Sequence, residues 1–184
     1  MSKMALACSL VAGALSALPT VAAADDVLAR FKGGIGVIPV SSGVVPQGVD
    51  GNTLLTSADV SRNFVRNVQP AGQVWVIDKL DAKVQVNGHI TVEGKGLVLA
   101  GGNNAGRTSG QSVFATLICQ AAAPFTQNST TLTGVPLTLT GDFRIDDMLS
   151  PAPSFPCASP MLLIRSTGTG NAWFAAGILR PNND

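Results

Sequence analysis

Apolar residues occur in short runs along the chain, and glycines and prolines separate these runs. The runs are rich in Val, Ile, Leu and Thr, which favour strands, and the turn residues return at short intervals. This pattern predicts a single all-β domain over residues 25–184, an antiparallel two-sheet sandwich of Ig-like or Greek-key type. The expected strands are 27–31, 35–40, 74–78, 82–86, 89–92, 97–100, 112–120, 137–140, 143–145, 161–165 and 172–179. A helix is considered only for residues 57–68, where Ser57 could form an N-cap.

The alternation of apolar and polar residues is clearest on either side of Asn87-Gly88. A three-residue turn, 86–88, would pair Val84 with Ile90 and put Gly88 where a left-handed residue is needed. This register separates the two faces of the hairpin. The apolar face would carry Leu80, Ala82, Val84, Ile90 and Val92, and the polar face Asp81, Lys83, Gln85, His89, Thr91 and Glu93.

The polar face of this hairpin contains the only histidine and the only glutamate of the chain, His89 and Glu93. Four residues along a strand span roughly 13 Å. General acid and base partners need hydrogen-bond contact, at about 3 Å. We therefore expect no catalytic pair here and predict that His89 is a surface residue beside a turn.

The first 24 residues, MSKMALACSLVAGALSALPTVAAA, are predicted to be a secretory signal peptide. A lysine precedes an apolar stretch, which ends in small residues, and cleavage is expected after Ala24. A retained membrane anchor is less favoured because Gly13, Ser16 and Pro19 interrupt the apolar stretch. We expect a secreted or periplasmic protein with no transmembrane segment after cleavage.

The charge of the remaining chain is balanced. Loss of Lys3 would leave 11 basic and 11 acidic residues. A net charge of zero gives no electrostatic reason to expect nucleic acid or an anionic membrane as a partner. It also does little to prevent self-association.

Two cysteines, Cys119 and Cys157, lie outside the predicted signal peptide. In an oxidising compartment such a pair predicts a disulfide. The alternative is a two-cysteine metal site, for which His89 would be the only other soft ligand. The disulfide is the favoured interpretation, and no cofactor or metal is expected.

Two motifs resemble ligand sites but lack essential parts. The stretch AGGNNAGRTSGQS, residues 100–112, resembles a phosphate-binding loop, but no lysine follows its glycines and a strand pattern replaces the helix. We interpret it as a mobile loop. The stretch GDFRIDD offers Asp142, Asp146 and Asp147 to calcium but lacks the spacing of a calcium loop.

The sequence offers little of the machinery that a hydrolase needs. It contains no G-x-S-x-G elbow, and its single glutamate and scattered aspartates form no recognisable pair of glycosidase carboxylates. We therefore expect no enzymatic activity.

Candidates for ligand contact are few. The chain has no tyrosine, and its two tryptophans, Trp75 and Trp173, lie in apolar strands where core packing is expected. A tryptophan that faced outward would be the best binding candidate. Together with Asn103, Asn104 and Arg107 of the glycine-rich loop, the tryptophans define a candidate ligand surface.

Four stretches, FKGGIGVIPVSSG, GQVWVIDKLDAKVQVNGHITVEGKGLVLAGG, GDFRIDD and NAWFAAGI, together resemble a group of small secreted bacterial hypothetical proteins. The resemblance implies a self-contained exported domain and transfers no catalytic or ligand residue. We expect a structural, adhesive or interaction module of the cell envelope or extracellular space. The alternatives are a secreted module that binds a ligand such as a glycan and, less favoured, a secreted hydrolase that uses aspartates.

Overall fold

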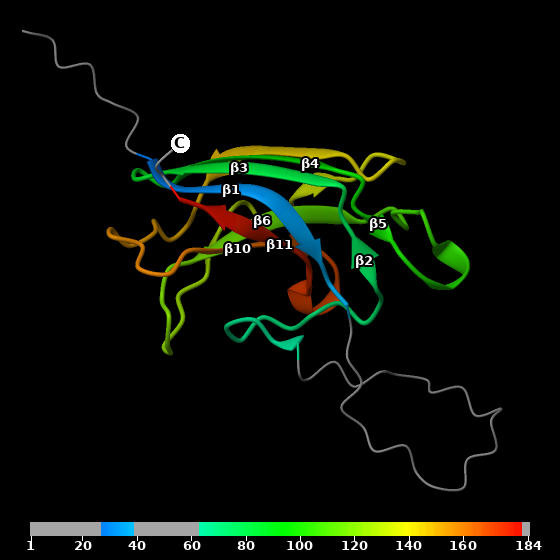
Figure 1. Ribbon diagram of the computed structural model, residues 1–184, viewed down its shortest axis with the longest axis horizontal. Coiled ribbons are helices and arrows are strands. Elements are labelled where there is room, and N and C mark those ends of the chain that lie inside the picture. Colours follow the sequence, from blue (N-terminus) through cyan, green and yellow to red (C-terminus); the bar gives the residue numbers. More distant parts are fainter. Residues whose placement is uncertain (1–26, 39–62, 182–184) are drawn as a thin grey trace, which may run out of the picture.

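The computed structural model describes residues 27–38 and 63–181, and these residues contain strands and short 3-10 turns but no α-helix (Figure 1). The all-β prediction is confirmed. The strands are β1 (Val27–Gly36), β2 (Trp75–Val76), β3 (Lys79–Gln85), β4 (His89–Lys95), β5 (Val98–Leu99), β6 (Ser112–Ile118), β7 (Asn128–Ser129), β8 (Val135–Pro136), β9 (Phe143–Met148), β10 (Met161–Ser166) and β11 (Trp173–Arg180). Two 3-10 turns are η2 (Gly102–Asn104) and η3 (Thr169–Asn171).

Nine strands form one antiparallel sheet in the order β7-β6-β10-β11-β1-β3-β4-β9, with β8 paired to β6. The two ends of this sheet meet. Ser129 of β7 and Ser150, just after β9, exchange backbone hydrogen bonds of 3.0 and 2.8 Å. The sheet is therefore nearly closed and barrel-like, and β2 and β5 form a separate two-stranded sheet.

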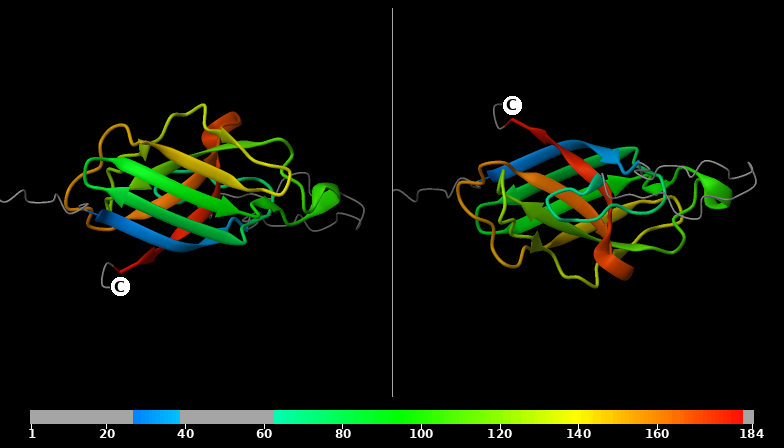
Figure 2. Two further views of the ribbon diagram at one scale, coloured as in Figure 1. Left: turned by 90° about the horizontal axis from the view of Figure 1, so that it is seen from above. Right: turned by 90° about the horizontal axis from the view of Figure 1, so that it is seen from below.

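The closed sheet is flattened into two layers. Figure 2 shows β1, β3, β4 and β9 from one side and β6, β10 and β11 from the other. Strand β1 pairs with both β3 and β11, so it joins the layers at one side, with register shifts in both pairings. The expectation of two separate sheets of Ig-like or Greek-key type is not confirmed, because the ladder of hydrogen bonds continues from one layer into the other.

The structure confirms both the register of the predicted hairpin and the face of the sheet on which each side chain lies. Val84 pairs with Ile90, and the Gly88 amide donates to the Gln85 carbonyl across a turn in which Gly88 has φ +90°. The apolar face points into the molecule: Leu80, Val84, Ile90 and Val92 are fully buried and Ala82 is nearly so.

The opposite layer supplies the other half of the core. Its inward residues are fully buried and come from β6 and β10: Val113, Ala115, Leu117, Leu162 and Ile164. Burial of each large aliphatic side chain contributes about 1.5–3 kcal/mol. The hydrophobic interior between the layers therefore holds the sheet in its flattened shape.

Residues 63–73 cover the outer face of the β6–β10 layer, where Figure 1 shows them beneath the strands. The helix considered for residues 57–68 is wrong in its described part. Val65 and Val68 form a tight turn by exchanging backbone hydrogen bonds, and Arg66 and Asn67 have φ of 48° and 67°. The guanidinium of Arg66 holds this turn in place, because it donates to the carbonyls of Ile118 and Ser159. Burial against the strands lowers the pKa of Arg66.

Most strand boundaries differ from the predictions by a few residues, and three differences are larger. The strands expected at 27–31 and 35–40 are one bent strand, β1, as far as Gly36. Residues 137–140 are not a strand; they form a turn closed by the hydrogen bond from the Gly141 amide to the Thr138 carbonyl. The two-residue strands β7 and β8 were not expected, since they are too short to show an alternating pattern.

Cys119 and Cys157 form a disulfide, as predicted, with Cα atoms 4.7 Å apart. Cys119 follows β6 and is 2% exposed, and Cys157 lies in the loop before β10. The amide of Ser159 donates to the Cys119 carbonyl beside the bond. The disulfide therefore ties the approach to β10 to the end of the strand with which β10 pairs.

The predicted signal peptide, residues 1–24, and its cleavage site at Ala24 lie outside the described residues. Within the described ranges, the chain forms no helix of the length and apolar character needed to cross a membrane.

Candidate functional site

A pocket of about 760 Å³ opens at the end of the molecule where the small β2–β5 sheet lies. We call it the Trp75 pocket. Its lining comes from the β2 and β5 region, the η2 loop, the approach to β6, and the η3 region with β10 and β11. The lining residues are Ala71, Gly72, Gln73, Trp75, Leu99, Gly101, Gly102, Asn103, Asn104, Ser109, Gln111, Ser166, Gly168, Ala172 and Phe174.

Two stacked aromatic rings form the floor of the Trp75 pocket. The rings of Trp75 and Phe174 have centroids 4.0 Å apart and planes inclined by 14°. Val37 links β2, which carries Trp75, to β11, which carries Phe174. Its amide donates to the Phe174 carbonyl, and its carbonyl accepts from the Trp75 amide. Trp75 is 4% and Phe174 5% exposed, so the pair is a rigid apolar base and not an open stacking platform.

Amides and hydroxyls surround this floor. Ser166 Oγ donates to Gln111 Oε1 over 3.0 Å and accepts from the Gly168 amide over 2.9 Å. Gln111 Nε2 has no hydrogen-bond partner among the described residues, so it can donate to a ligand. Gln73, Asn103 and Asn104 are exposed at the rim.

The electrostatic character of the Trp75 pocket follows from its composition. Every polar side chain that lines it is an uncharged amide or hydroxyl. Amides and hydroxyls can both donate and accept hydrogen bonds. The pocket therefore suits a neutral ligand that presents many hydroxyl groups beside an apolar surface.

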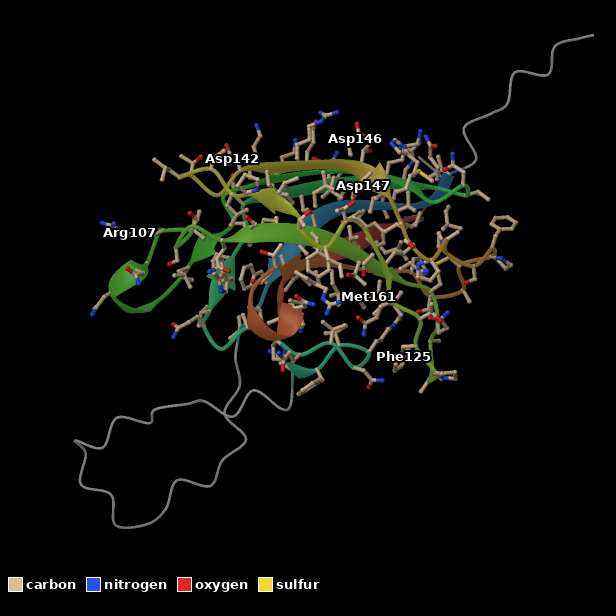
Figure 3. The ribbon with its side chains drawn as sticks, turned by 180° about the vertical axis from the view of Figure 1, so that it is seen from behind. Arg107, Phe125, Asp142, Asp146, Asp147 and Met161 are labelled. Carbon is tan, nitrogen blue, oxygen red and sulfur yellow. A yellow bond between two sulfur atoms is a disulfide. The ribbon has the colours of Figure 1, made fainter. Side chains whose placement is uncertain are left out.

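The structure brings together three of the five residues of the predicted ligand surface. Trp75, Asn103 and Asn104 line the pocket, whereas Trp173 and Arg107 do not. Trp173 is 5% exposed and its Nε1 donates to the Asn63 carbonyl, so it packs in the core as expected for a strand tryptophan. Arg107 lies on the loop at one end of the molecule (Figure 3).

Sequence reasoning missed the other polar residues of the Trp75 pocket. Gln73, Gln111 and Ser166 belong to three separate segments that only the folded chain brings together. The stacking partner of Trp75 was also missed, although Phe174 follows Trp173 directly. The one sequence feature that Gln73, Gln111 and Ser166 share is a position at or near the end of an apolar strand. That feature is too common to identify a site.

Strand β6, and not a helix, follows the glycine-rich loop, as its sequence pattern predicted. The base of the loop is closed by hydrogen bonds from the Leu99 amide to the Arg107 carbonyl and from the Gly106 amide to the Leu99 carbonyl. The loop therefore presents Asn103 and Asn104 from a defined turn, η2.

His89 and Glu93 have different partners, on the neighbouring strand β9. His89 Nε2 lies 2.7 Å from Asp146 Oδ1, and Glu93 Oε1 lies 2.5 Å from Arg144 Nη1. The cross-strand His89–Asp146 pair was not predicted, because it depends on the pairing of β4 with β9. Its side chains are 33% and 52% exposed, and neither residue lines the Trp75 pocket.

The three aspartates of GDFRIDD do not converge. Asp142 accepts from the Gly96 amide, Asp146 contacts His89, and Asp147 accepts from the Thr131 amide. Figure 3 shows the three distributed along β9 and its approach. Among the described residues, no group of three or more His, Cys, Asp and Glu side chains could hold a metal ion.

The carboxylate of Asp147 links β9 to the turn after β7. Burial raises its pKa, but hydrogen bonds from Thr131 and from the Met148 amide outweigh that effect, and its pKa is lowered overall. A carboxyl whose pKa is lower in the folded state stabilises the fold above its unfolded pKa, which is about 3.9. This stabilisation disappears as the pH falls through the folded pKa.

We expect Asp147→Asn to lower the free energy of unfolding by about 1 kcal/mol at pH 7, because the amide replaces a charged acceptor with a weaker one. The difference from wild type should shrink below about pH 4, where the wild-type carboxyl also becomes neutral. Urea denaturation between pH 2.5 and 7 measures it. Asp146→Asn is the control and should lower the free energy of unfolding by less, about 0.5 kcal/mol, since Asp146 makes only exposed ion pairs. A difference that does not depend on pH would contradict the role given to the charge.

No model of a known protein family matches this chain, and neither a curated protein nor a solved structure shows significant similarity to it.

Proposed function

We propose that the chain is an exported, non-enzymatic interaction module that binds a neutral glycan in the Trp75 pocket. The observation that carries this proposal is the lining, in which amides and hydroxyls surround an aromatic floor and no side chain is charged. Sugar hydroxyls both donate and accept hydrogen bonds, and sugar C–H faces are apolar. Both properties match the pocket.

The size of the Trp75 pocket supports a small ligand. Its volume of about 760 Å³ falls within the range of about 300–1,000 Å³ that is common for ligand sites. The Trp75–Phe174 pair is already stacked and buried, so the floor is formed before a ligand arrives. A preformed floor lowers the entropic cost of binding.

The position of the titratable residues supports a non-enzymatic role. A catalytic acid or base must reach the bound substrate. His89 and Asp146 lie on the exposed face of β4 and β9, and neither lines the Trp75 pocket.

The disulfide supports an extracellular or periplasmic location, because such bonds persist in oxidising compartments. This agrees with the signal peptide predicted for residues 1–24. A module of the cell envelope or extracellular space would meet polysaccharides there.

Self-association is a second candidate role, supported by exposed apolar side chains. Leu139 is 93% and Phe155 71% exposed. Pairing through free strand edges is less supported, since β7 already meets the end of β9. Analytical ultracentrifugation of the purified protein measures its oligomeric state. It accompanies the binding experiment below, so that binding is assigned to a monomer or to a defined oligomer.

We expect the mature protein to bind at least one neutral oligosaccharide on a glycan array, and the double variant Gln73→Ala/Asn103→Ala to bind it at least tenfold more weakly. Each lost hydrogen bond contributes about 1 kcal/mol, and about 1.4 kcal/mol corresponds to a factor of ten. Calorimetric titration with the array hit measures the change.

Arg107→Ala is the matched control, because Arg107 lies on the same loop outside the lining. It should leave the affinity unchanged. Absence of any neutral hit on the array, or an equal loss in the variant and the control, would overturn the proposal.

A further inference from the structure

Arg165 is a buried cation without a carboxylate partner among the described residues. Its side chain projects from β10 onto the outer face of the β6–β10 layer, over the ring of Phe114, and the residue is 7% exposed. No ion pair joins it to an acidic group within residues 27–38 and 63–181. Burial lowers its pKa, but an arginine remains protonated in proteins. The fold therefore keeps a positive charge at this position.

Neutral groups hold two of the three guanidinium nitrogens. Nε donates to the Asn171 carbonyl over 2.8 Å, and Nη1 donates to Gln127 Oε1 over 2.7 Å and to Thr116 Oγ1 over 3.3 Å. Nη2 makes no hydrogen bond to a residue in the described part of the chain. The guanidinium is thus fixed in orientation and retains a free donor.

Gln127 retains a free donor for a related reason. Its Oε1 must face Arg165, because a guanidinium has no acceptor. This orientation leaves Gln127 Nε2 without a partner among the described residues. The two side chains together offer two solvent-accessible donors, Arg165 Nη2 and Gln127 Nε2, that no described protein group occupies.

Arg165 and Gln127 line a pocket of about 460 Å³, which we call the Arg165 pocket. The rest of its lining consists of hydroxyl, amide and apolar residues: Ser129, Thr130, Thr131, Leu132, Met148, Ser150 and Asn171. It contains no acidic residue. The carboxylate of Asp147, next to Met148, accepts hydrogen bonds from the Thr131 and Met148 amides.

We propose that the Arg165 pocket binds the oxyanion group of a small ligand, a carboxylate, sulfate or phosphate. Arg165 Nη2 and Gln127 Nε2 donate to the oxyanion oxygens. Hydrogen bonds between a guanidinium and an oxyanion are charge-assisted and about twice as strong as neutral ones, and the guanidinium of Arg165 is already held in one orientation by its other hydrogen bonds. The site is independent of the proposed glycan binding, since the Arg165 and Trp75 pockets share no lining residue.

The test is calorimetric titration of the mature protein with sodium sulfate, sodium phosphate and sodium glucuronate, each at constant ionic strength against sodium chloride. Glucose serves as the neutral counterpart of glucuronate. We expect saturable binding of at least one oxyanion and none of glucose at this site. Sulfate and phosphate binding would identify an inorganic oxyanion or its ester as the ligand group, and glucuronate binding alone would identify an acidic sugar.

Two variants assign the binding to the pocket. Gln127→Ala changes an exposed side chain and should weaken the affinity at least tenfold, and Arg165→Gln should abolish binding. Circular dichroism establishes whether Arg165→Gln is folded; if it is not, Gln127→Ala decides. Gln73→Ala, in the Trp75 pocket, is the control and should leave oxyanion binding unchanged.

Two results would overturn the proposal. One is the absence of saturable binding for all three oxyanions at millimolar concentration. The other is binding that Gln127→Ala leaves unchanged, which would place the anion elsewhere. Neither result bears on the glycan array, so the two proposals fail separately.

Discussion

The double variant Cys119→Ala/Cys157→Ala should lose about 2–5 kcal/mol of unfolding free energy. The disulfide spans 38 residues of sequence, and closing a loop of that length lowers the entropy of the unfolded chain by an amount worth about 4 kcal/mol. For a domain of this size the melting temperature should fall by about 10 °C. Thermal and urea denaturation measure both quantities.

The native state should retain its fold without the disulfide at low temperature. Cys119 continues a strand whose core residues, Val113 and Leu117, are fully buried, and these contacts do not depend on the bond. Wild-type protein treated with a reductant is the control and should lose as much stability as the double variant, which itself should not respond to reductant. Free-thiol labelling of both cysteines in unreduced native protein would contradict the prediction.

Gly141→Ala should lower the free energy of unfolding by more than about 3 kcal/mol. Gly141 has φ +83°, a left-handed conformation that costs an alanine about 1–2 kcal/mol. A Cβ atom there would also lie 2.5 Å from the backbone N and O of Leu97, whose amide donates to the Gly141 carbonyl. Backbone atoms cannot move aside as a flexible side chain can, so the turn before β9 must shift.

Gly106→Ala separates the two effects. Gly106 has φ +76°, but a Cβ atom there would meet nothing within 4 Å. This control should cost only about 1–2 kcal/mol, from the conformation alone. Equal losses in the two variants, measured by urea denaturation, would show that the contact with Leu97 contributes nothing.

The candidate site could be anticipated only in fragments. Asn103 and Asn104 stood out because they interrupt a glycine-rich loop, and Trp75 because tryptophan is rare in this chain. Arg165 did not stand out, since a lone arginine after MLLI resembles an ordinary exposed residue at a strand end. The groups that accept its hydrogen bonds, the Gln127 amide oxygen and the Asn171 carbonyl, belong to other segments.

The sequence by itself determined the local geometry of this protein. Alternation around Gly88 placed Val84 and Ile90 together on the core face, and the even pair of cysteines indicated the disulfide. The hairpin register depends only on residues that are close together in the sequence, and the disulfide depends on the chemistry of cysteine. A side chain's direction in a strand follows from its position in an alternating pattern, so no tertiary information was required.

Only the tertiary structure decided how the strands were arranged and which residues shared a pocket. The sheet is nearly closed by hydrogen bonds between Ser129 and Ser150, which lie in segments too short to carry a pattern. His89 meets Asp146, and Trp75 meets Phe174, across strands that are distant in the sequence. The physical reason is that backbone pairing between distant segments uses the same N–H and C=O groups in every residue, so the sequence does not mark which segments will pair.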